Sequence, residues 1–374
     1  MKTISLFSGC GGMDLGAEEA GAEIIFSNDI DNDACETLQK YFPNARVHNG
    51  DIADIKDFPK AELLIGGYPC QSFSMGGNRD PEKDPRTKLY LHFVRCLQKI
   101  KPKFFVAENV SGLKGLKGGA FFKEQFEEFE RQGYIVTAKL LNARDYGVPQ
   151  VRKRLLIVGV RRELNSIFTF PEETHGKATK KKPHLLPYAS HGEAIKDLPL
   201  WPTGEFYERP HDPEGHMSWY YMSRNRKKKW DEPAFTVVAN WRHITIHPAS
   251  PTMKLTWSNL ADGFKQRWDF SSEYEHLEKD ATRPILETPR RLSWRECARI
   301  QTFPHDFEPV GSTESKFQQI GNAVPPKLAR AVLSHLISGK GVIDYEDFVK
   351  EPKLKDALDH YSTKEELQRA LALS

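Results

Sequence analysis

The sequence predicts an α/β fold built on a doubly wound, mostly parallel sheet, with a second, smaller and irregular domain. Over the first 165 residues, short apolar runs typical of buried strands alternate with segments that have helical spacing. From about residue 170 to 287 this periodicity is lost, while Pro, Lys, His and Trp become frequent. At 374 residues the chain is long enough to form two domains.

The composition excludes several classes of protein. The net charge is +3 and no apolar run approaches a membrane-spanning length, so we expect a protein without a membrane span. The chain opens on a strand-like segment, which predicts no signal peptide and a cytoplasmic location. The five cysteines include no C-x-x-C pair, so neither a disulfide framework nor a zinc or other metal site is predicted.

The first strand-like run, residues 4–7, leads into a glycine-rich turn at residues 8–12 that opens a helix. Glycines let backbone N–H groups approach a ligand at a helix N-terminus. Asp29 closes the second strand, where a carboxylate can bind ribose hydroxyls. The G-x-G-x-x-G pattern fails because its last position is Asp14. A ribose-containing cofactor is therefore indicated, with a plain glycine turn and a nicotinamide oxidoreductase as alternatives.

Three further predicted strands end in residues that can carry chemistry. Asp51 follows the third strand and could bind an adenine amine or simply cap the next helix. Cys70 follows the fourth strand on a loop, and Glu108 closes the fifth. Because the carboxyl ends of parallel strands meet at one edge of a sheet, we expect these side chains to lie near Asp29. A buried hydrophobic role remains the alternative for the cysteine.

The remaining elements of this half are predicted from apolar spacing. We expect helices at 89–100 and 121–129 and strands at 103–110, 134–141 and 155–160. Arg152 and Arg154 alternate into the last strand, so we expect them to point to the same side. Residues 175–260 hold thirteen Lys and Arg against eight Asp and Glu, with aromatic residues among them. This pattern favours contact with nucleic acid over a merely solvated basic face.

Six motifs occur in the order found in the DNA (cytosine-5)-methyltransferase family, which the chain therefore resembles. They are F-S-G-C-G-G at 7–12, P-C-Q at 69–71, E-N-V at 108–110, Q-x-R-x-R at 150–154, R-R-L-S-W-R-E-C at 290–297 and Q-I-G-N-A-V-P-P at 319–326. The match covers residues 1–165 and 288–335, and the compact size resembles the prokaryotic restriction–modification type. The resemblance implies a class I S-adenosylmethionine-dependent, Rossmann-like catalytic fold.

The resemblance also divides the chain into parts. Residues 1–170 are expected to form the catalytic, cofactor-binding domain, and residues 171–287 the target-recognition domain. Residues 288–340 would return to the catalytic domain. Residues 341–374 lie past the last family motif, and their leucine spacing predicts a helical C-terminal extension of unknown role. We expect it to pack on the catalytic domain, with a protein contact as the alternative.

The resemblance implies the roles of the site residues. Cys70 would add to carbon 6 of cytosine, and Glu108 would meet ring nitrogen 3 and the exocyclic amine. Arg152 and Arg154 would hold the carbonyl oxygen and orient either Glu108 or a phosphate. S-adenosylmethionine, with S-adenosylhomocysteine as product, would be bound by Phe7, Ser8, Gly9, Cys10, Gly11, Gly12, Asp29, Ile30, Asp51, Ile52, Pro69, Asn322 and Val324. Double-stranded DNA would be contacted by Gln71, Ser74, Arg224, Arg226, Lys227, Thr236 and Arg242.

The implied function is transfer of a methyl group to carbon 5 of a flipped-out cytosine in a short, specific duplex sequence. The enzyme would act as a monomer and protect DNA from a restriction endonuclease, without a need for physical contact between the two. An RNA cytosine-5 methyltransferase and a catalytically silent DNA-binding module remain as alternatives. The presence of Cys70, Glu108 and Arg154 counts against the silent module.

Overall fold

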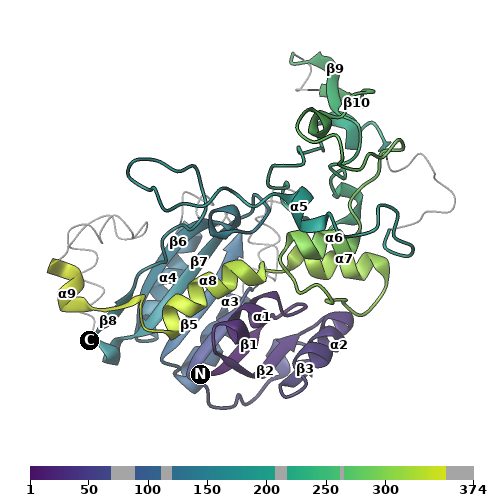
Figure 1. Cartoon of the computed structure of the whole chain (residues 1–374). Helices are drawn as coiled ribbons and strands as arrows, with labels where there is room; N and C mark the ends of the chain where they lie inside the picture. Colours follow the sequence, from purple (N-terminus) through teal and green to yellow (C-terminus); the bar gives the residue numbers. More distant parts are fainter. Residues whose placement is uncertain (69–88, 111–119, 207–216, 262–264, 351–374) are drawn as a thin grey trace. The chain divides into compact units, whose positions relative to one another are not determined.

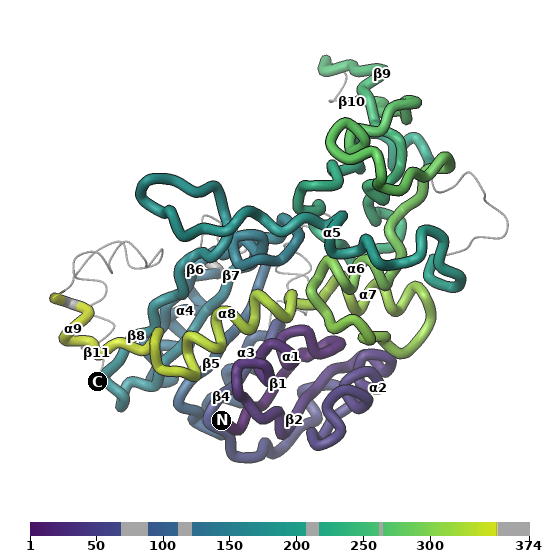
Figure 2. Tube along the Cα trace, viewed as in Figure 1, coloured from purple at the N-terminus to yellow at the C-terminus, as the bar shows by residue number. Residues whose placement is uncertain are grey.

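The computed structural model describes residues 1–68, 89–110, 120–206, 217–261 and 265–350. The chain divides into two compact units. Unit 1 contains Met1–Tyr146, Lys153–Glu173 and Val324–Ser374, and unit 2 contains Gly147–Arg152 and Thr174–Ala323. Figure 2 follows the chain from its purple N-terminus to its yellow C-terminal part. Because the chain passes between the units at four points, neither unit is one continuous segment.

Unit 1 is built on a seven-stranded sheet with the order β3-β2-β1-β4-β5-β7-β6 (Figure 1). The first five strands pair in parallel, whereas β7 runs antiparallel to both of its neighbours. The mostly parallel sheet is therefore confirmed. The strands are β1 (Lys2–Leu6), β2 (Glu23–Asp29), β3 (Arg46–Asn49), β4 (Leu63–Gly66), β5 (Phe104–Val110), β6 (Tyr134–Asn142) and β7 (Lys153–Arg161).

Helices cover both faces of this sheet, as a doubly wound fold requires (Figure 1). One face carries α1 (Gly12–Glu19), α2 (Asn32–Tyr41) and α8 (Pro326–Ile337), and the other carries α3 (Tyr90–Ile100) and α4 (Ala120–Arg131). All four residues of β4 are buried, as expected for a strand covered on both sides.

Helices α1 and α8 pack against each other although more than 300 residues separate them in the chain. Gly16 of α1 makes this packing possible. A Cβ atom at Gly16 would lie 2.4 Å from the carbonyl oxygen of Pro326 and 2.7 Å from the Cβ atom of Ala329. The C-terminal helix therefore completes the packing of the N-terminal one.

Aromatic rings fill the core beneath α3 and α4. The ring of Phe105 lies 5.8 Å from that of Phe93, 4.8 Å from that of Phe129 and 5.1 Å from that of Tyr134. Phe105 is paired with Gly159 across β5 and β7, and a Cβ atom at Gly159 would lie 1.9 Å from the Phe105 ring. The antiparallel strand therefore needs a glycine opposite this phenylalanine.

The chain beyond α8 packs on unit 1 as far as it is described. Strand β11 (Val342–Asp344) pairs antiparallel with β8 (Ser166–Phe168), and α9 (Tyr345–Lys350) follows. Phe348 of α9 is buried against Ile135 and Ile167. The described part of the extension therefore packs on unit 1, through two short strands that were not predicted, and the packing of residues 341–374 on the catalytic domain stays a prediction.

Unit 2 has little regular structure. Its helices are α5 (His191–Ile195), α6 (Trp294–Ile300) and α7 (Thr313–Asn322), and its strands β9 (Met253–Asn259) and β10 (Lys265–Phe270) form a hairpin. Two 3₁₀ helices, Tyr221–Ser223 and Trp241–His243, lie in the irregular part. None of the described helices in either unit is long and apolar enough to cross a membrane.

Residues 288–323 group with unit 2, whereas we expected the return to the catalytic domain at residue 288. Helix α6 packs against both α5 and α7, so residues 288–323 belong to unit 2, and the chain re-enters unit 1 at Val324. The prediction also missed that Gly147–Arg152 belongs to unit 2. Motif order along a sequence carries no information about which of two units a motif packs in.

Candidate functional site

The glycine turn after β1 has the left-handed backbone that its sequence predicts. Phe7, Gly9 and Gly11 have φ values of 54°, 55° and 82°. Gly11 precedes α1, and a Cβ atom there would lie 2.5 Å from the ring of Phe42. A positive φ in a phenylalanine is uncommon and is typical of constrained functional loops.

Asp29, the last residue of β2, holds this turn in place. Its Oδ2 accepts a hydrogen bond of 2.7 Å from the Gly9 amide, and its Oδ1 accepts one of 3.0 Å from the Asp31 amide. Burial raises the pKa of Asp29, and the amide hydrogen bonds oppose that rise. The next residue, Ile30, is 73% exposed. A carboxylate beside an exposed apolar side chain suits a ribose that carries a flat ring.

Asp51 has the capping role that was the alternative for it, and the Ile52 side chain is part of the core. The Oδ1 atom of Asp51 accepts a 2.8 Å hydrogen bond from the Ala53 amide and caps the 3₁₀ helix Ile52–Asp54. Ile52 is 3% exposed and packs in the core of unit 1. An adenine contact through the Ile52 side chain is therefore excluded by its burial, and only its main chain could take part.

A buried carboxyl group lies beneath the glycine turn. Asp14 is fully buried and accepts hydrogen bonds from Ser5 Oγ at 2.9 Å and Ser27 Oγ at 3.2 Å. Ser8 Oγ donates to Ser5 Oγ at 2.8 Å, which connects the turn to Asp14. Burial raises the pKa of Asp14 to about 7. In the sequence Asp14 occupies only the failed last position of G-x-G-x-x-G, and no local pattern reports this network.

Glu108 and Arg154 form an ion pair between β5 and β7. Arg154 Nε lies 2.7 Å from Glu108 Oε1, and the two side chains are 14% and 12% exposed. A Cβ atom at Gly67 would lie 3.1 Å from Glu108 Oε2, so the chain that leaves β4 passes directly beside this carboxylate. Burial lowers the pKa of Arg154, and Glu108 opposes that shift. The predicted partnership of these two residues is present.

Pro69, Cys70, Gln71 and Ser74 lie outside the described residues. The described cysteines, Cys10, Cys35, Cys96 and Cys297, are all buried. Burial raises the pKa of each of these thiols, to about 11 in Cys35. None of these four has the thiolate character that a nucleophile needs.

Arg152 has a different role from the one predicted. Its side chain is 1% exposed, and its guanidinium donates to the carbonyl oxygens of Val237 at 2.9 Å, Gly321 at 2.9 Å and Ala323 at 2.8 Å. A guanidinium committed to buried main-chain carbonyls is not available to a cytosine carbonyl. The strand alternation that predicted a shared direction with Arg154 does not apply, because β7 begins only at Lys153.

Thr236 is anchored to the same short piece of unit 2. Its hydroxyl donates to the Val151 carbonyl at 2.7 Å, and the amide of the next residue, Val237, donates to Gln150 Oε1 at 2.7 Å. Gln150 Nε2 in turn donates to Gln301 Oε1 at 2.9 Å. Hydrogen bonds to Gly147–Arg152 therefore anchor residues 235–238. Gln301 was missed, since nothing in its sequence context indicates a partner.

The residues predicted to contact DNA fall into two groups. Arg224 and Arg242 are exposed, whereas Arg226 and Lys227 are only 8% and 6% exposed. The latter pair is buried because Ile246 bridges to Lys227 and its amide donates to the Arg226 carbonyl at 3.0 Å. The buried Lys227 side chain therefore does not reach a phosphate in this conformation. The Arg226 guanidinium stacks on Tyr221, 4.8 Å from the centre of its ring.

The last two cofactor predictions fall on opposite sides of the boundary between the units. Asn322 is the exposed final residue of α7 in unit 2, and Val324 is the buried first residue of the returning part of unit 1. Their joint contribution to a cofactor pocket stays a prediction.

Comparisons with known proteins agree with this geometry. The family model described as C-5 cytosine-specific DNA methylase matches residues 1–338. The chain belongs to the C-5 cytosine-specific DNA methylase family.

Two named relatives illustrate the membership, and one solved structure shares the fold. Type II methyltransferase M.BspRI of Lysinibacillus sphaericus is 40% identical over 370 residues, covering 88% of this chain and 80% of that protein. M.FnuDI of Fusobacterium nucleatum is 38% identical over 371 residues, covering 96% and 100%. The Entamoeba histolytica methyltransferase EhMeth shares the fold, with a TM-score of 0.61 and 17% identity over 91% of this chain and 98% of that one.

The predicted DNA (cytosine-5)-methyltransferase of restriction–modification type is thus confirmed, as is its S-adenosylmethionine-dependent class of fold.

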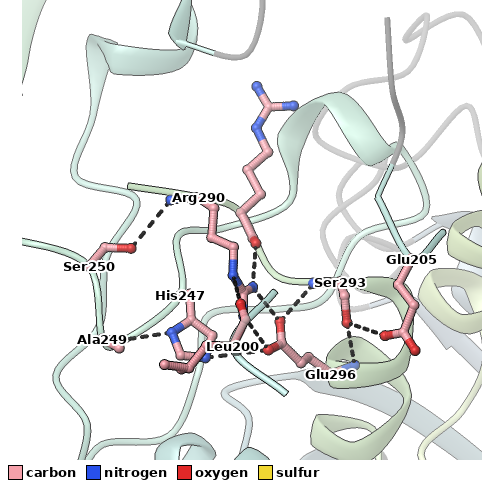
Figure 3. A network of polar contacts seen from close by, with 9 residues as sticks. Leu200, Glu205, His247, Ala249, Ser250, Arg290, Ser293 and Glu296 are labelled. Atoms are coloured by element: carbon pink, nitrogen blue, oxygen red, sulfur yellow. Dashed lines mark hydrogen bonds and ion pairs between the residues drawn. The ribbon is translucent and has the colours of Figure 1, made fainter. Parts of the chain in front are cut away.

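One network of this methylase was not predicted (Figure 3). Arg290 binds Glu296 through two hydrogen bonds of 2.8 Å, and His247 Nε2 lies 3.3 Å from Glu296 Oε1. Burial opposes the ionisation of Glu296, but His247 and Arg290 hold its pKa down at about 2. The R-R-L-S-W-R-E-C motif marked these positions, yet its sequence does not reveal His247 as the third member.

Proposed function

We propose that this DNA (cytosine-5)-methyltransferase modifies a cytosine that is flipped out of duplex DNA, at one short sequence. The observation that carries the proposal is the Glu108–Arg154 ion pair at the carboxyl edge of the sheet, beside the chain that leaves β4 toward Cys70. A carboxyl group held beside a guanidinium suits recognition of a pyrimidine edge by paired hydrogen bonds.

The chain's own residues supply the covalent part of the mechanism. The Cys70 thiolate forms a bond to carbon 6, and the electron pair of the 5,6 double bond becomes available at carbon 5. Glu108, held by Arg154, keeps a proton at ring nitrogen 3 and so offsets the charge that develops on the ring. After carbon 5 is methylated, a base removes its proton, the double bond re-forms and the sulfur leaves. The burial of the four described cysteines supports Cys70 as the nucleophile.

S-adenosylmethionine supplies the electrophilic methyl group when it is bound. The residues of unit 1 fit this cofactor, because the left-handed turn at Gly9 and Gly11 lies beside the carboxylate of Asp29, which accepts from the Gly9 amide. Ile30, 73% exposed, would pack on the adenine ring. Phe7, Ser8, Cys10 and Gly12 complete the turn, and the main chain at Ile52 lies next to the Asp51 cap.

Unit 2 would read the DNA. Arg224 and Arg242 are exposed cations there, and Thr236 lies in a loop held by buried hydrogen bonds. Flipping a base costs a few kcal/mol, which contacts to phosphates and neighbouring bases offset. Methylation of the site would protect it from a restriction endonuclease, and the enzyme would act on DNA as a monomer.

The test is methyl transfer from labelled S-adenosylmethionine to unmethylated duplex DNA, with RNA in parallel, followed by nucleoside mass spectrometry. We expect 5-methyldeoxycytidine from DNA alone. The Cys70→Ser variant should lose at least about 10³-fold in rate and should fail to form a covalent complex with 5-fluorocytosine DNA. Cys96→Ala, which removes a core thiol, is the matched control and should keep both properties. Label in RNA alone would overturn the substrate, and an active Cys70→Ser variant would overturn the mechanism.

A further inference from the structure

Three segments of unit 2 are joined into a small arginine-rich surface. Ile246 bridges to Lys227 on one side and to Arg291 on the other. Tyr221 donates its hydroxyl to the Ile244 carbonyl at 2.6 Å, and the Arg291 guanidinium donates to the Trp241 carbonyl at 3.4 Å. Residues 220–227, 241–246 and 291 are therefore neighbours in space, although up to 70 positions separate them in the chain.

Four arginines gather on this surface around two tyrosines. The guanidinium groups of Arg226 and Arg291 lie 4.8 and 4.1 Å from the ring of Tyr221. Arg224 and Arg242 are exposed beside them. Among the described residues no ion pair joins Arg224, Arg226 or Arg242 to a carboxylate, and the charges that act on Arg226 come from arginines and tyrosines. A guanidinium has only hydrogen-bond donors, so the exposed Arg224 and Arg242 suit acceptors such as O6 and N7 of guanine. The buried Arg226 instead donates its Nε to the Tyr221 carbonyl at 3.1 Å.

His243 is the odd member of this surface. Its ring lies 5.7 Å from that of Tyr220 in an edge-to-face arrangement, and it is half-buried. Burial, and then Arg226, Arg291, Arg224 and Arg242, lower the pKa of His243. A neutral imidazole keeps one nitrogen that accepts a hydrogen bond.

Two asparagine side chains in and next to these segments have their oxygens engaged in turns. Asn225 Oδ1 accepts from the Lys227 amide at 2.9 Å, and Asn240 Oδ1 accepts from the Arg242 amide at 3.0 Å. The surface therefore combines several outward donors with an imidazole that can accept. In the major groove only the exocyclic amino groups of cytosine and adenine offer a donor.

We infer that His243 is a specificity-determining residue, whose imidazole accepts a hydrogen bond from the exocyclic amino group of a cytosine or adenine in the recognition sequence. The inference rests on the proposed function, because it takes unit 2 to be the part that reads DNA. The arginines would read guanines, and His243 would read an amine on the same or a neighbouring base pair.

The test begins with a library of duplexes whose bases around a cytosine are randomised. Methylated molecules are sequenced after bisulfite treatment for the wild-type protein and for His243→Ala, His243→Gln and His243→Lys. We expect the alanine and lysine variants to lose about tenfold in selectivity at one base pair, as for one lost hydrogen bond. Glutamine, whose amide oxygen can accept, should keep most of it. His305→Ala, an exposed histidine of the same unit, should leave the pattern unchanged.

A second arm identifies the amine. Duplexes in which pyrimidin-2-one replaces a cytosine, or purine replaces an adenine, lack only the exocyclic amino group. Removing the correct amine should cost the wild type about tenfold in rate and should cost His243→Ala nothing further. If wild type and His243→Ala read the same sequence with equal selectivity, the inference falls while the proposed function stands. If the wild type methylates no duplex, the proposed function itself falls.

Discussion

Asp14 is a carboxyl group whose environment disfavours its ionised form. The side chain has no exposure, and its side-chain hydrogen bonds come from the hydroxyls of Ser5 and Ser27. Two neutral hydroxyl donors do not offset the desolvation of a carboxylate. The burial of this group raises its pKa from 3.8 to about 7.

The first prediction follows from this pKa. Because the folded state holds the proton more tightly than the unfolded chain, the free energy of unfolding should fall as pH rises from 5 to 7 and level off above. Asp14→Asn cannot ionise and should gain about 3 kcal/mol relative to the wild type between pH 5 and pH 8. Denaturant unfolding of unit 1 at several pH values checks this. Parallel stability curves for the two proteins would show that Asp14 does not titrate in the fold.

At this scale the sequence was informative where a residue type has one physical reason to be present. The left-handed turn at Gly9 and Gly11, the carboxylate of Asp29 and the pairing of Glu108 with Arg154 were all predicted. Burial could not be predicted from a basic run, so Lys227 was taken for a surface cation.

At the scale of elements, the contact of α1 with α8 depends on one small residue. Gly16 lies within a helix, where alanine is ordinarily better than glycine by about 1 kcal/mol. Here, a Cβ atom would lie 2.4 Å from the Pro326 carbonyl oxygen and 2.7 Å from the Arg330 amide nitrogen. Main-chain atoms of α8 cannot move aside as a side chain can.

We therefore predict that Gly16→Ala destabilises unit 1, by about 2 kcal/mol, because the overpacking outweighs the helix propensity. Thermal unfolding measures the effect. The double variant Gly16→Ala with Ala329→Gly should recover only part of the loss, since it removes one Cβ contact and leaves the main-chain contacts. A gain in stability in the single variant would contradict the close approach of the two helices.

Elements with strong periodicity were predicted to within a few residues, as α3 and α4 illustrate. The hairpin of β9 and β10 was missed although residues 253–258 alternate between apolar and polar side chains, which is the pattern of a strand. Most of this strand covers no core, since its apolar residues Leu255 and Trp257 are exposed. The short pairing of β8 with β11 depends on residues far apart in the chain, and no local pattern reports it.

At the scale of the whole molecule, a piece of six residues decides how unit 2 is assembled. Gly147–Arg152 belongs to unit 2 although unit 1 precedes and follows it in the chain. Arg152 holds the carbonyls of Val237, Gly321 and Ala323, and Gln150 holds Gln301 and the Val237 amide. These residues tie the middle of the long segment of unit 2, at Val237, to its C-terminal part.

We predict that Arg152→Met leaves buried carbonyl oxygens without donors and destabilises unit 2 by about 3 kcal/mol or more. Hydrogen exchange should rise around residues 235–238 and 319–323. Arg154→Lys is the control: it should reduce methyl transfer, because it changes the partner of Glu108, while exchange in unit 2 stays as in the wild type. Unchanged exchange in Arg152→Met would mean that the guanidinium is not structural.

The two-part composition of unit 2 has a consequence for how a DNA specificity could be inherited. A gene that exchanged only the block encoding Thr174–Ala323 would place a foreign segment on the host's own Gly147–Arg152. The exchanged segment would fold correctly where donor and host share the glutamine at 150 and the arginine at 152, because these two side chains bind the long segment of unit 2. Where donor and host differ at these two positions, recombination would also have to exchange the short block that encodes Gly147–Arg152.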